Sequence, residues 1–323
     1  MNNTYESFYE LDIEEQIRHL LVERNVASKI KNPEQRENHY TDITSGKEYW
    51  RANDGRRPQD LTLILNTDGV SMSNSSKRNL WPLMCTIAEI PIRFRESFIV
   101  ILGFWCSQIK PKLNSFLKPF VTQMNTYYDK GIKWLHPITN NLYNSKIRAP
   151  VVVTDAPARA EVQCILNFNG RFGCNICEIE TVQVKRNKKR AIRVFPFVRI
   201  KDLVLRTEER MLSQAAIKKE KNLEHFKGVK EKAAAAGLPG ADWSTVVTSE
   251  YMHAVLLGIG GTGLDYQFGP KAPMPCKRKL KDVNKDLLKV KPPDTFPRRP
   301  RSLAERGSFK ANEFLCWILY YSV

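Results

Sequence analysis

The chain lacks any long hydrophobic run. No stretch approaches the roughly 18 to 20 apolar residues that a membrane-spanning helix needs. The N-terminus, MNNTYESFYELDIEEQ, is acidic and polar, whereas a secretory signal is first basic and then apolar. These absences exclude the membrane-spanning and secreted classes, and they predict a soluble intracellular protein with no membrane partner.

Cysteine is scarce and unevenly spaced. The seven cysteines are an odd number, and only Cys174 and Cys177 lie close together in the sequence. A secreted disulfide framework has a different pattern, with an even set at short spacings. We therefore expect reduced thiols or a metal site.

Acidic residues are fewer than basic residues. Lys and Arg total 51 against 34 Asp and Glu, which gives a net charge of +17 and a sequence pI near 9.6. Nucleic acid and an anionic membrane surface both attract such a chain, and the absence of membrane features favours nucleic acid. With 323 residues and 42% hydrophobic content, the chain can form one large domain with an insertion or two modest domains.

Several segments have the pattern of regular structure. Three apolar, β-prone runs at 61–66, 80–90 and 97–106 predict an antiparallel meander. Phe116, Phe120 and Met124 recur four residues apart and predict a helix after Pro111. The run APVVVTD at 149–155 is typical of a strand buried on both faces, and a helix is expected behind it. The predicted order is three strands, helix, strand, helix.

The remaining segments are less regular. Ile13, Ile17, Leu20 and Leu21 predict an accessory helix near the N-terminus. Residues 178–245 are charged and helix-prone with no strand pattern, and 270–301, rich in Pro, Lys and Arg, predict a linker or backbone-binding stretch. The last segment, SFKANEFLCWILYYSV, predicts an amphipathic helix.

Two aspartates follow predicted strands. Asp68 ends LTLILNTD and Asp155 ends VVVTD, so both carboxylates are placed where strand ends meet. Two divalent cations need carboxylate oxygens on rigid elements. The alternatives are a hairpin turn for Asp68-Gly69 and a helix N-cap for Asp155.

Other residues are also open to more than one interpretation. Cys174 and Cys177 can reach one zinc ion, with His253 as a third ligand or as an ordinary core histidine. The basic run KRNKKR at 185–190 is a solvated face, a nuclear localisation signal or a phosphate-binding segment. Glu313, on the C-terminal helix, has the position of a surface charge.

A series of motifs in order along the chain resembles one family. The motifs are DITSGKEYW, NTDGVSMSNSSKRNLWPL, AEIP, ILGFWCSQIKPKLNSFLKPFV, VVTDAPARAEVQ, FNGRFGCNIC, EYMHAVLLGI, KPPDTFPRRPRSL and KANEFLCWILYYS. Together they cover about residues 42–322. They resemble the catalytic domain of CACTA (En/Spm)-type cut-and-paste DNA transposases, especially animal copies.

The resemblance implies an α/β fold: an RNase H-like mixed sheet flanked by helices, with a mostly helical basic insertion between the second and third acidic residues. It implies a catalytic triad of Asp68, Asp155 and Glu313 that binds Mg²⁺ or Mn²⁺, and structural Zn²⁺ held by Cys174, Cys177 and His253. At Asn312 relatives have His. The expected partners are DNA ends, target DNA and further copies of the chain, with no small-molecule substrate.

The resulting organisation has four parts: an accessory segment at 1–55, the catalytic core at 56–177, the basic insertion at 178–300 and a catalytic helix at 301–323. The chain ends where relatives continue, so we expect a truncated copy. Three hypotheses stay open: an active nuclear transposase, an inactive or host-adopted DNA-binding protein, and a zinc-stapled regulatory protein without a nucleic-acid role.

Overall fold

The computed structural model describes residues 6–35, 39–72, 78–187, 190–269, 279–294 and 298–321. The chain divides into two compact units, Met1–Thr248 and Ser249–Val323, and each is described by itself. The four-part division predicted from the sequence stays a prediction.

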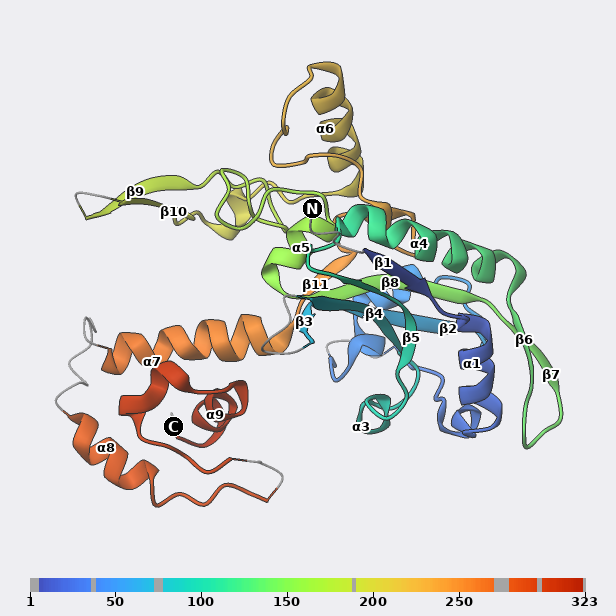
Figure 1. The fold of residues 1–323 in the computed structure, drawn as a ribbon, viewed down its shortest axis with the longest axis horizontal. Helices are drawn as coiled ribbons and strands as arrows, with labels where there is room; N and C mark the ends of the chain where they lie inside the picture. Colours follow the sequence, from blue (N-terminus) through green and yellow to red (C-terminus); the bar gives the residue numbers. More distant parts are fainter. Residues whose placement is uncertain are drawn as a thin grey trace. The chain divides into compact units, whose positions relative to one another are not determined.

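A mixed sheet forms the centre of the first unit (Figure 1). The strands β2 (Leu61–Thr67), β4 (Asn79–Ile87) and β5 (Val100–Ser107) pair as neighbouring antiparallel strands, which confirms the predicted meander. The predicted buried strand is β8 (Ile147–Thr154), which pairs with β2 in parallel.

Two short strands complete the sheet at its edges. β1 (Ser7–Glu10) pairs with β5 at one edge, and β11 (Val247–Ser249) lies next to β8 at the other. The order is therefore β1-β5-β4-β2-β8-β11, and β3 (Val70–Ser71) also pairs with β4. A meander followed by a parallel strand on its far side, with helices flanking the sheet, is an RNase H-like arrangement, as expected.

Helices cover this sheet because their apolar residues repeat at helical spacing. In α4 (Leu113–Lys130) Phe116, Phe120 and Met124 are buried, as predicted. In α1 (Ile13–Val22) Ile13 and Ile17 are fully buried in the same core. The N-terminal segment, expected to be accessory, thus contributes both an edge strand and core residues.

The helix expected behind β8 is α5 (Ala156–Val162). The shorter elements of the first unit, with 3-10 helices labelled η, are η1 (Val26–Lys29), η2 (Ile43–Ser45), α2 (Lys47–Ala52), α3 (Ile92–Arg95), β6 (Ile132–Leu135), β7 (Leu142–Ser145), η3 (Ile200–Asp202), α6 (Glu208–Glu220) and η4 (Ala234–Gly237).

Part of the segment at 178–245, for which no strand was expected, forms a β-hairpin. β9 (Val182–Asn187) and β10 (Arg190–Val194) pair antiparallel, and the ribbon extends away from the sheet (Figure 1). The expectation of no strand between 178 and 245 is therefore wrong. Val182 and Val184 do alternate with polar residues, but the surrounding charges dominate the composition. Lys188 and Lys189 of the basic run lie outside the described residues.

The second unit is helical. It contains η5 (Met252–Gly260, a π-helix), α7 (Gly261–Phe268), α8 (Leu280–Leu287), η7 (Leu303–Ser308), α9 (Ala311–Cys316) and η8 (Trp317–Tyr321, a π-helix). Leu264, Phe314 and Trp317 are buried in a core of its own, and α9 confirms the predicted C-terminal helix. α8 lies inside the predicted linker. Among the helices described, none is both long and apolar enough to cross a membrane.

Candidate functional site

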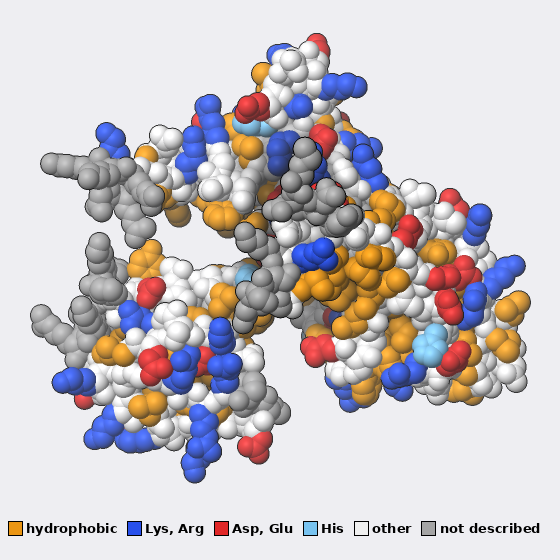
Figure 2. Space-filling model, in the orientation of Figure 1, with side chains coloured by type: hydrophobic (Ala, Val, Ile, Leu, Met, Phe, Trp, Pro, Cys, Tyr) orange, Lys and Arg blue, Asp and Glu red, His pale blue; other side chains and the backbone are white. Residues whose placement is uncertain are grey.

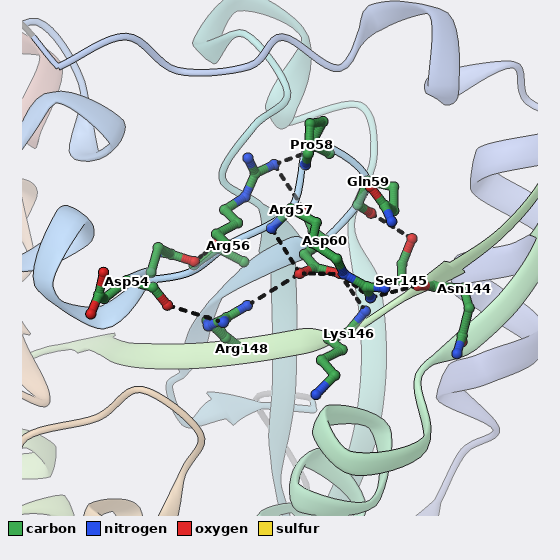
Figure 3. A network of polar contacts seen from close by, with 12 residues as sticks. Asp54, Arg56, Arg57, Pro58, Gln59, Asp60, Asn144, Ser145, Lys146 and Arg148 are labelled. Atoms are coloured by element: carbon green, nitrogen blue, oxygen red, sulfur yellow. Dashed lines mark hydrogen bonds and ion pairs between the residues drawn. The ribbon is translucent and has the colours of Figure 1, made fainter.

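The parallel pair β2 and β8 is anchored where both strands begin (Figure 3). The buried Asp60 carboxylate lies 2.7 Å from the Arg57 guanidinium and 3.6 Å from that of Arg148, and it accepts the backbone N–H of Lys146 at 2.9 Å. Burial alone would raise the pKa of Asp60, but the hydrogen bonds from Arg57 and Lys146 outweigh it and lower the pKa. This network fixes the register of the two strands.

A second buried carboxylate joins β4 to the start of β2. Glu89 accepts the Tyr49 hydroxyl at 2.7 Å and the Thr62 backbone N–H at 3.0 Å, and Arg56 lies 3.3 Å away. Burial and the nearby Glu89 charge raise the pKa of Tyr49. The acidic residue of the AEIP motif is therefore structural.

The register brings Asp68 and Asp155 to the same edge of the sheet. Asn66 is paired with Val153, the Asn66 amide donates to the Val153 carbonyl at 2.9 Å, and the Thr154 hydroxyl donates to the Thr67 carbonyl at 2.9 Å. Asp68 and Asp155 are each two residues beyond the pair Asn66–Val153. They therefore follow neighbouring parallel strands at equivalent positions.

The alternative interpretation of Asp68-Gly69 as a hairpin turn is wrong. β2 and β3, on either side of the dipeptide, both pair with β4, and the register is the same before and after it. The chain continues in one direction. At Gly69 a Cβ atom would overlap the Trp81 indole, so only glycine lets this ring lie against the backbone beside Asp68.

Asp155 is a helix cap, as the alternative interpretation predicted. Its Oδ1 accepts the Ala158 backbone N–H at 2.9 Å, and Pro157 lies in the first turn of α5. The exposed Asp68 accepts the Gly69 N–H through Oδ1 at 2.7 Å. Within the described part of the chain, the second oxygen of each carboxylate has no hydrogen-bond partner, so capping does not exclude cation binding.

Glu313 belongs to the second unit, so its approach to the two aspartates stays a prediction. Its buried carboxylate accepts Arg301 Nε at 2.5 Å and Arg301 Nη2 at 3.0 Å, and it also accepts the Lys310 backbone N–H at 2.7 Å. Burial alone would raise the pKa of Glu313, but the hydrogen bonds from Arg301 outweigh it and lower the pKa. Both oxygens are thus engaged by the protein.

The two cysteines are brought together. The Sγ atoms of Cys174 and Cys177 lie 3.5 Å apart, and Cys174 Sγ accepts the N–H groups of Ile176 and Cys177 at 3.4 Å. Two thiolates bound to one tetrahedral zinc lie about 3.8 Å apart, given Zn–S bonds of about 2.3 Å. The pair therefore fits zinc. Burial raises the pKa of the Cys177 thiol, and zinc favours the deprotonated form.

His253 lies in the second unit, on η5, and is not a core residue. Its side chain is 41% exposed, and Nδ1 lies 2.6 Å from a carboxylate oxygen of Glu250. A carboxylate at one ring nitrogen orients the imidazole and leaves Nε2 for a metal. Its approach to the cysteines stays a prediction.

Several residues around the strand ends were not predicted from the sequence. The Lys110 ammonium lies 2.8 Å from Glu161 of α5 and 4.8 Å from the centre of the Trp81 ring. Burial lowers the pKa of Arg159, and the nearby Cys174 and Asp155 offset only part of this effect. All of these residues lie within the motifs of the family resemblance, but nothing in the sequence showed which of them meet at the strand ends.

The donor set at the strand ends fits a hard divalent cation, because each aspartate has one carboxylate oxygen that no described residue engages. In the described ranges, no group of three or more His, Cys, Asp or Glu side chains is arranged around a metal position. Asp68 and Asp155, like Cys174 and Cys177, are therefore pairs within the first unit.

Comparison with known proteins identifies one family. The family model described as "Transposase family tnp2" matches residues 35–228, more than half of the chain. The match includes both aspartates and both cysteines and ends before His253 and Glu313. No curated protein matches the chain.

Proposed function

Because the chain belongs to the tnp2 family of transposases, we propose that it is a CACTA (En/Spm)-type DNA transposase with a nuclease centre at the ends of β2 and β8. The family implies action on DNA, and the charge of +17 suits a polyanionic partner. The observation that carries the catalytic part is the equivalent position of Asp68 and Asp155 on neighbouring parallel strands.

In this proposal Asp68 and Asp155 hold Mg²⁺ or Mn²⁺, and Glu313 is the third acidic ligand. When bound, such cations lower the pKa of water and stabilise charge on phosphoryl oxygens. Hydrolysis adds water across a phosphodiester and releases a 3′-hydroxyl. That hydroxyl then attacks target DNA, so that one P–O bond forms as another breaks.

The protein's part is to position these groups. The Asp60 network sets the register that places Asp68 beside Asp155, and the Ala158 N–H orients the Asp155 carboxylate. Glu313 acts only after exchanging at least part of its contact with Arg301, since that side chain engages both oxygens.

The test is nicking of supercoiled plasmid by the full chain with Mn²⁺. An Asp68→Asn, Asp155→Asn double variant should nick about 1000-fold more slowly, a typical loss when residues of a catalytic unit are removed. Asn preserves helix capping, so α5 should keep its stability. Asp129→Asn, an exposed position on α4, is the matched control, and equal nicking by the double variant would contradict the proposal.

A second candidate function is DNA binding without cleavage, by an inactive or host-adopted copy. The observation that favours it is the full engagement of Glu313 by Arg301 and the Lys310 N–H. It predicts salt-sensitive DNA binding, with no nicking by the wild-type chain at any Mn²⁺ concentration.

For zinc, the proposal assigns Cys174, Cys177 and His253 as structural ligands. The close thiol pair and the Glu250–His253 contact support it. Such an ion would cross-link the segments that carry its ligands. Elemental analysis should find zinc in the wild type and in Cys106→Ser but not in Cys174→Ser, and equal zinc in both variants would argue against these ligands.

The proposal also covers the localisation and the oligomeric state of the protein. The basic run at 185–190 would direct the protein to the nucleus. Microscopy of a tagged Lys185→Gln, Arg186→Gln variant tests this localisation.

Pairing of two element ends requires at least a dimer. Sedimentation of the DNA complex tests this requirement, and a complex that contains one copy of the chain would contradict it.

A further inference from the structure

A cavity opens between the β1–β5 edge of the sheet and the first turns of α4. Its volume is about 440 Å³, within the range of small-molecule sites. Phe8 and Trp105 line it from the sheet, Phe116 from the helix, and Lys110 and Lys112 from the connecting loop. Hydrophobic side chains gather on the surface over these strands (Figure 2).

The aromatic wall belongs to a row that crosses the sheet. Phe8 is paired with Trp105, and Trp105 with Trp81. The Trp81 ring lies against Gly69, next to Asp68. Because neighbouring strands lie about 4.8 Å apart, the Trp105 backbone is roughly 10 Å from β2. The cavity is therefore close to the proposed nuclease centre.

The Trp105 ring is held in place. Its Nε1 donates to the Ile109 carbonyl at 3.0 Å, while Phe8 packs edge-on against Phe116 with ring centres 5.8 Å apart. Rings fixed in this way lose little conformational entropy when a flat ligand stacks on them. The wall is thus preorganised for an aromatic ligand.

Positive charge lies at the same opening. Lys112 is exposed, and Lys110 spans from the cavity to the Trp81 ring and Glu161 of α5. Lysines beside aromatic rings are the combination that binds single-stranded nucleic acid, since ammonium groups contact phosphates while the rings stack on bases.

The helix also supplies a hydrogen-bond acceptor. Pro119 lies inside α4 and has no N–H, so the Ser115 carbonyl lacks its usual helical partner. Ser115 and Pro119 both line the cavity. An N–H group of a ligand in the cavity can satisfy this carbonyl.

We infer that this cavity receives a single nucleobase, unstacked from a DNA strand whose backbone runs past Lys110 and Lys112. Stacking on Trp105 and Phe8 binds the base without selecting its identity. The inference rests on the proposed function only in that DNA is the partner. The inference assigns Trp105 a role in DNA binding.

The experiment measures DNA binding by the full chain in EDTA, by fluorescence anisotropy of a labelled 20-nucleotide single strand and of the matching duplex. Trp105→Ala should weaken single-strand binding about tenfold and change duplex binding less than twofold. Trp105→Phe should recover most of the affinity, because stacking is kept. Tyr9→Ala removes an exposed aromatic residue from β1, the edge strand that also carries Phe8, and should change neither affinity.

The inference would be overturned by unchanged single-strand binding of Trp105→Ala with wild-type melting, by an equal loss for duplex and single strand, or by no recovery in Trp105→Phe. Free deoxythymidine monophosphate, added at the same concentration as the labelled single strand, should displace less than a tenth of the bound strand. Full displacement would assign the cavity to a free nucleotide. Displacement by an apolar peptide alone would assign it to a protein partner.

The outcome is separable from that of the proposed function. EDTA removes any cation-dependent cleavage, so the binding result stands whether or not the Asp68→Asn, Asp155→Asn variant loses nicking. Conversely, loss of nicking with unchanged binding by Trp105→Ala supports the nuclease and rejects the base cavity.

Discussion

Gly69 shows how one missing side chain shapes the surroundings of Asp68. The register of β2 and β3 along β4 is continuous through this glycine, and the Trp81 ring occupies the space where a Cβ atom would be. A larger residue must push the ring or the strand aside, because close-packed atoms cannot overlap.

Gly69→Ala should therefore lower the free energy of unfolding by about 1 to 3 kcal/mol and reduce Mn²⁺-dependent nicking. Urea denaturation and plasmid nicking measure the two effects. Gly263→Ala is the matched control, since nothing lies within 4 Å of the added Cβ in helix α7; it should stabilise by roughly 0.5 to 1 kcal/mol. Equal effects of both substitutions would contradict the packing argument.

Asp60 makes stability depend on pH. Its folded-state pKa is lowered below the ordinary value of 3.8, so its contribution is fully present above about pH 4 and is lost as pH falls through the folded pKa. Arg148, which lies 6% exposed beside it, makes loss of the carboxylate costly.

Asp60→Asn should lower the free energy of unfolding by about 3 kcal/mol at pH 7. The difference in this free energy between variant and wild type should become smaller below pH 4. Urea denaturation at pH 7 and pH 3 measures this. Asp202→Asn is the control, because it removes the exposed partner of Arg199 at the same i,i+3 spacing. It should lower the free energy of unfolding by less than about 1 kcal/mol. A difference that stays constant with pH would rule out the ionised carboxylate as the cause.

At the scale of elements, the β9–β10 hairpin is the clearest departure from expectation. The hairpin pairs within itself, and Val182, Val184 and Ile192 on it are exposed. A two-stranded ribbon gains little stability alone. Its basic residues make it suited to contact with a DNA backbone.

Lys185→Gln should weaken DNA binding and reduce the slope of log affinity against log salt by about one, the effect of losing one phosphate contact. Anisotropy titrations at several salt concentrations measure the slope. Lys133→Gln, an exposed lysine on the separate β6–β7 hairpin, serves as the control. The same slope for Lys185→Gln and wild type would place this hairpin away from DNA.

At the scale of the whole molecule, the described residues form two separate hydrophobic cores, one in each unit. Leu65 is fully buried in the first and Leu264 is buried in the second. Since the cores share no residues, each unit should unfold with its own stability.

Leu65→Ala and Leu264→Ala should each lower the stability of one unit by about 2 to 5 kcal/mol. Hydrogen exchange followed by mass spectrometry on the full chain reports each unit separately. Protection should fall in β2 and β8 for the first variant and in α7 and α9 for the second. Loss of protection throughout the chain in either variant would show that the two units unfold together as one cooperative unit.

The sequence alone determined the elements whose signals are local. The apolar runs before Asp68 and Asp155, the four-residue spacing of Phe116, Phe120 and Met124, and the capping role of Asp155 depend on residues a few positions apart, and the structure confirms them. The motif series also identified a transposase before the family match.

Tertiary structure decided what depends on distant residues. β1 joins the sheet through β5, nearly a hundred residues away. Asp68 lies between β2 and β3 without a reversal of the chain, because both strands pair with β4 in one register. The cavity needs Phe8, Trp105 and Phe116 together. Such contacts gain their free energy from burial and pairing across the fold, and no local spacing records which distant segments will meet.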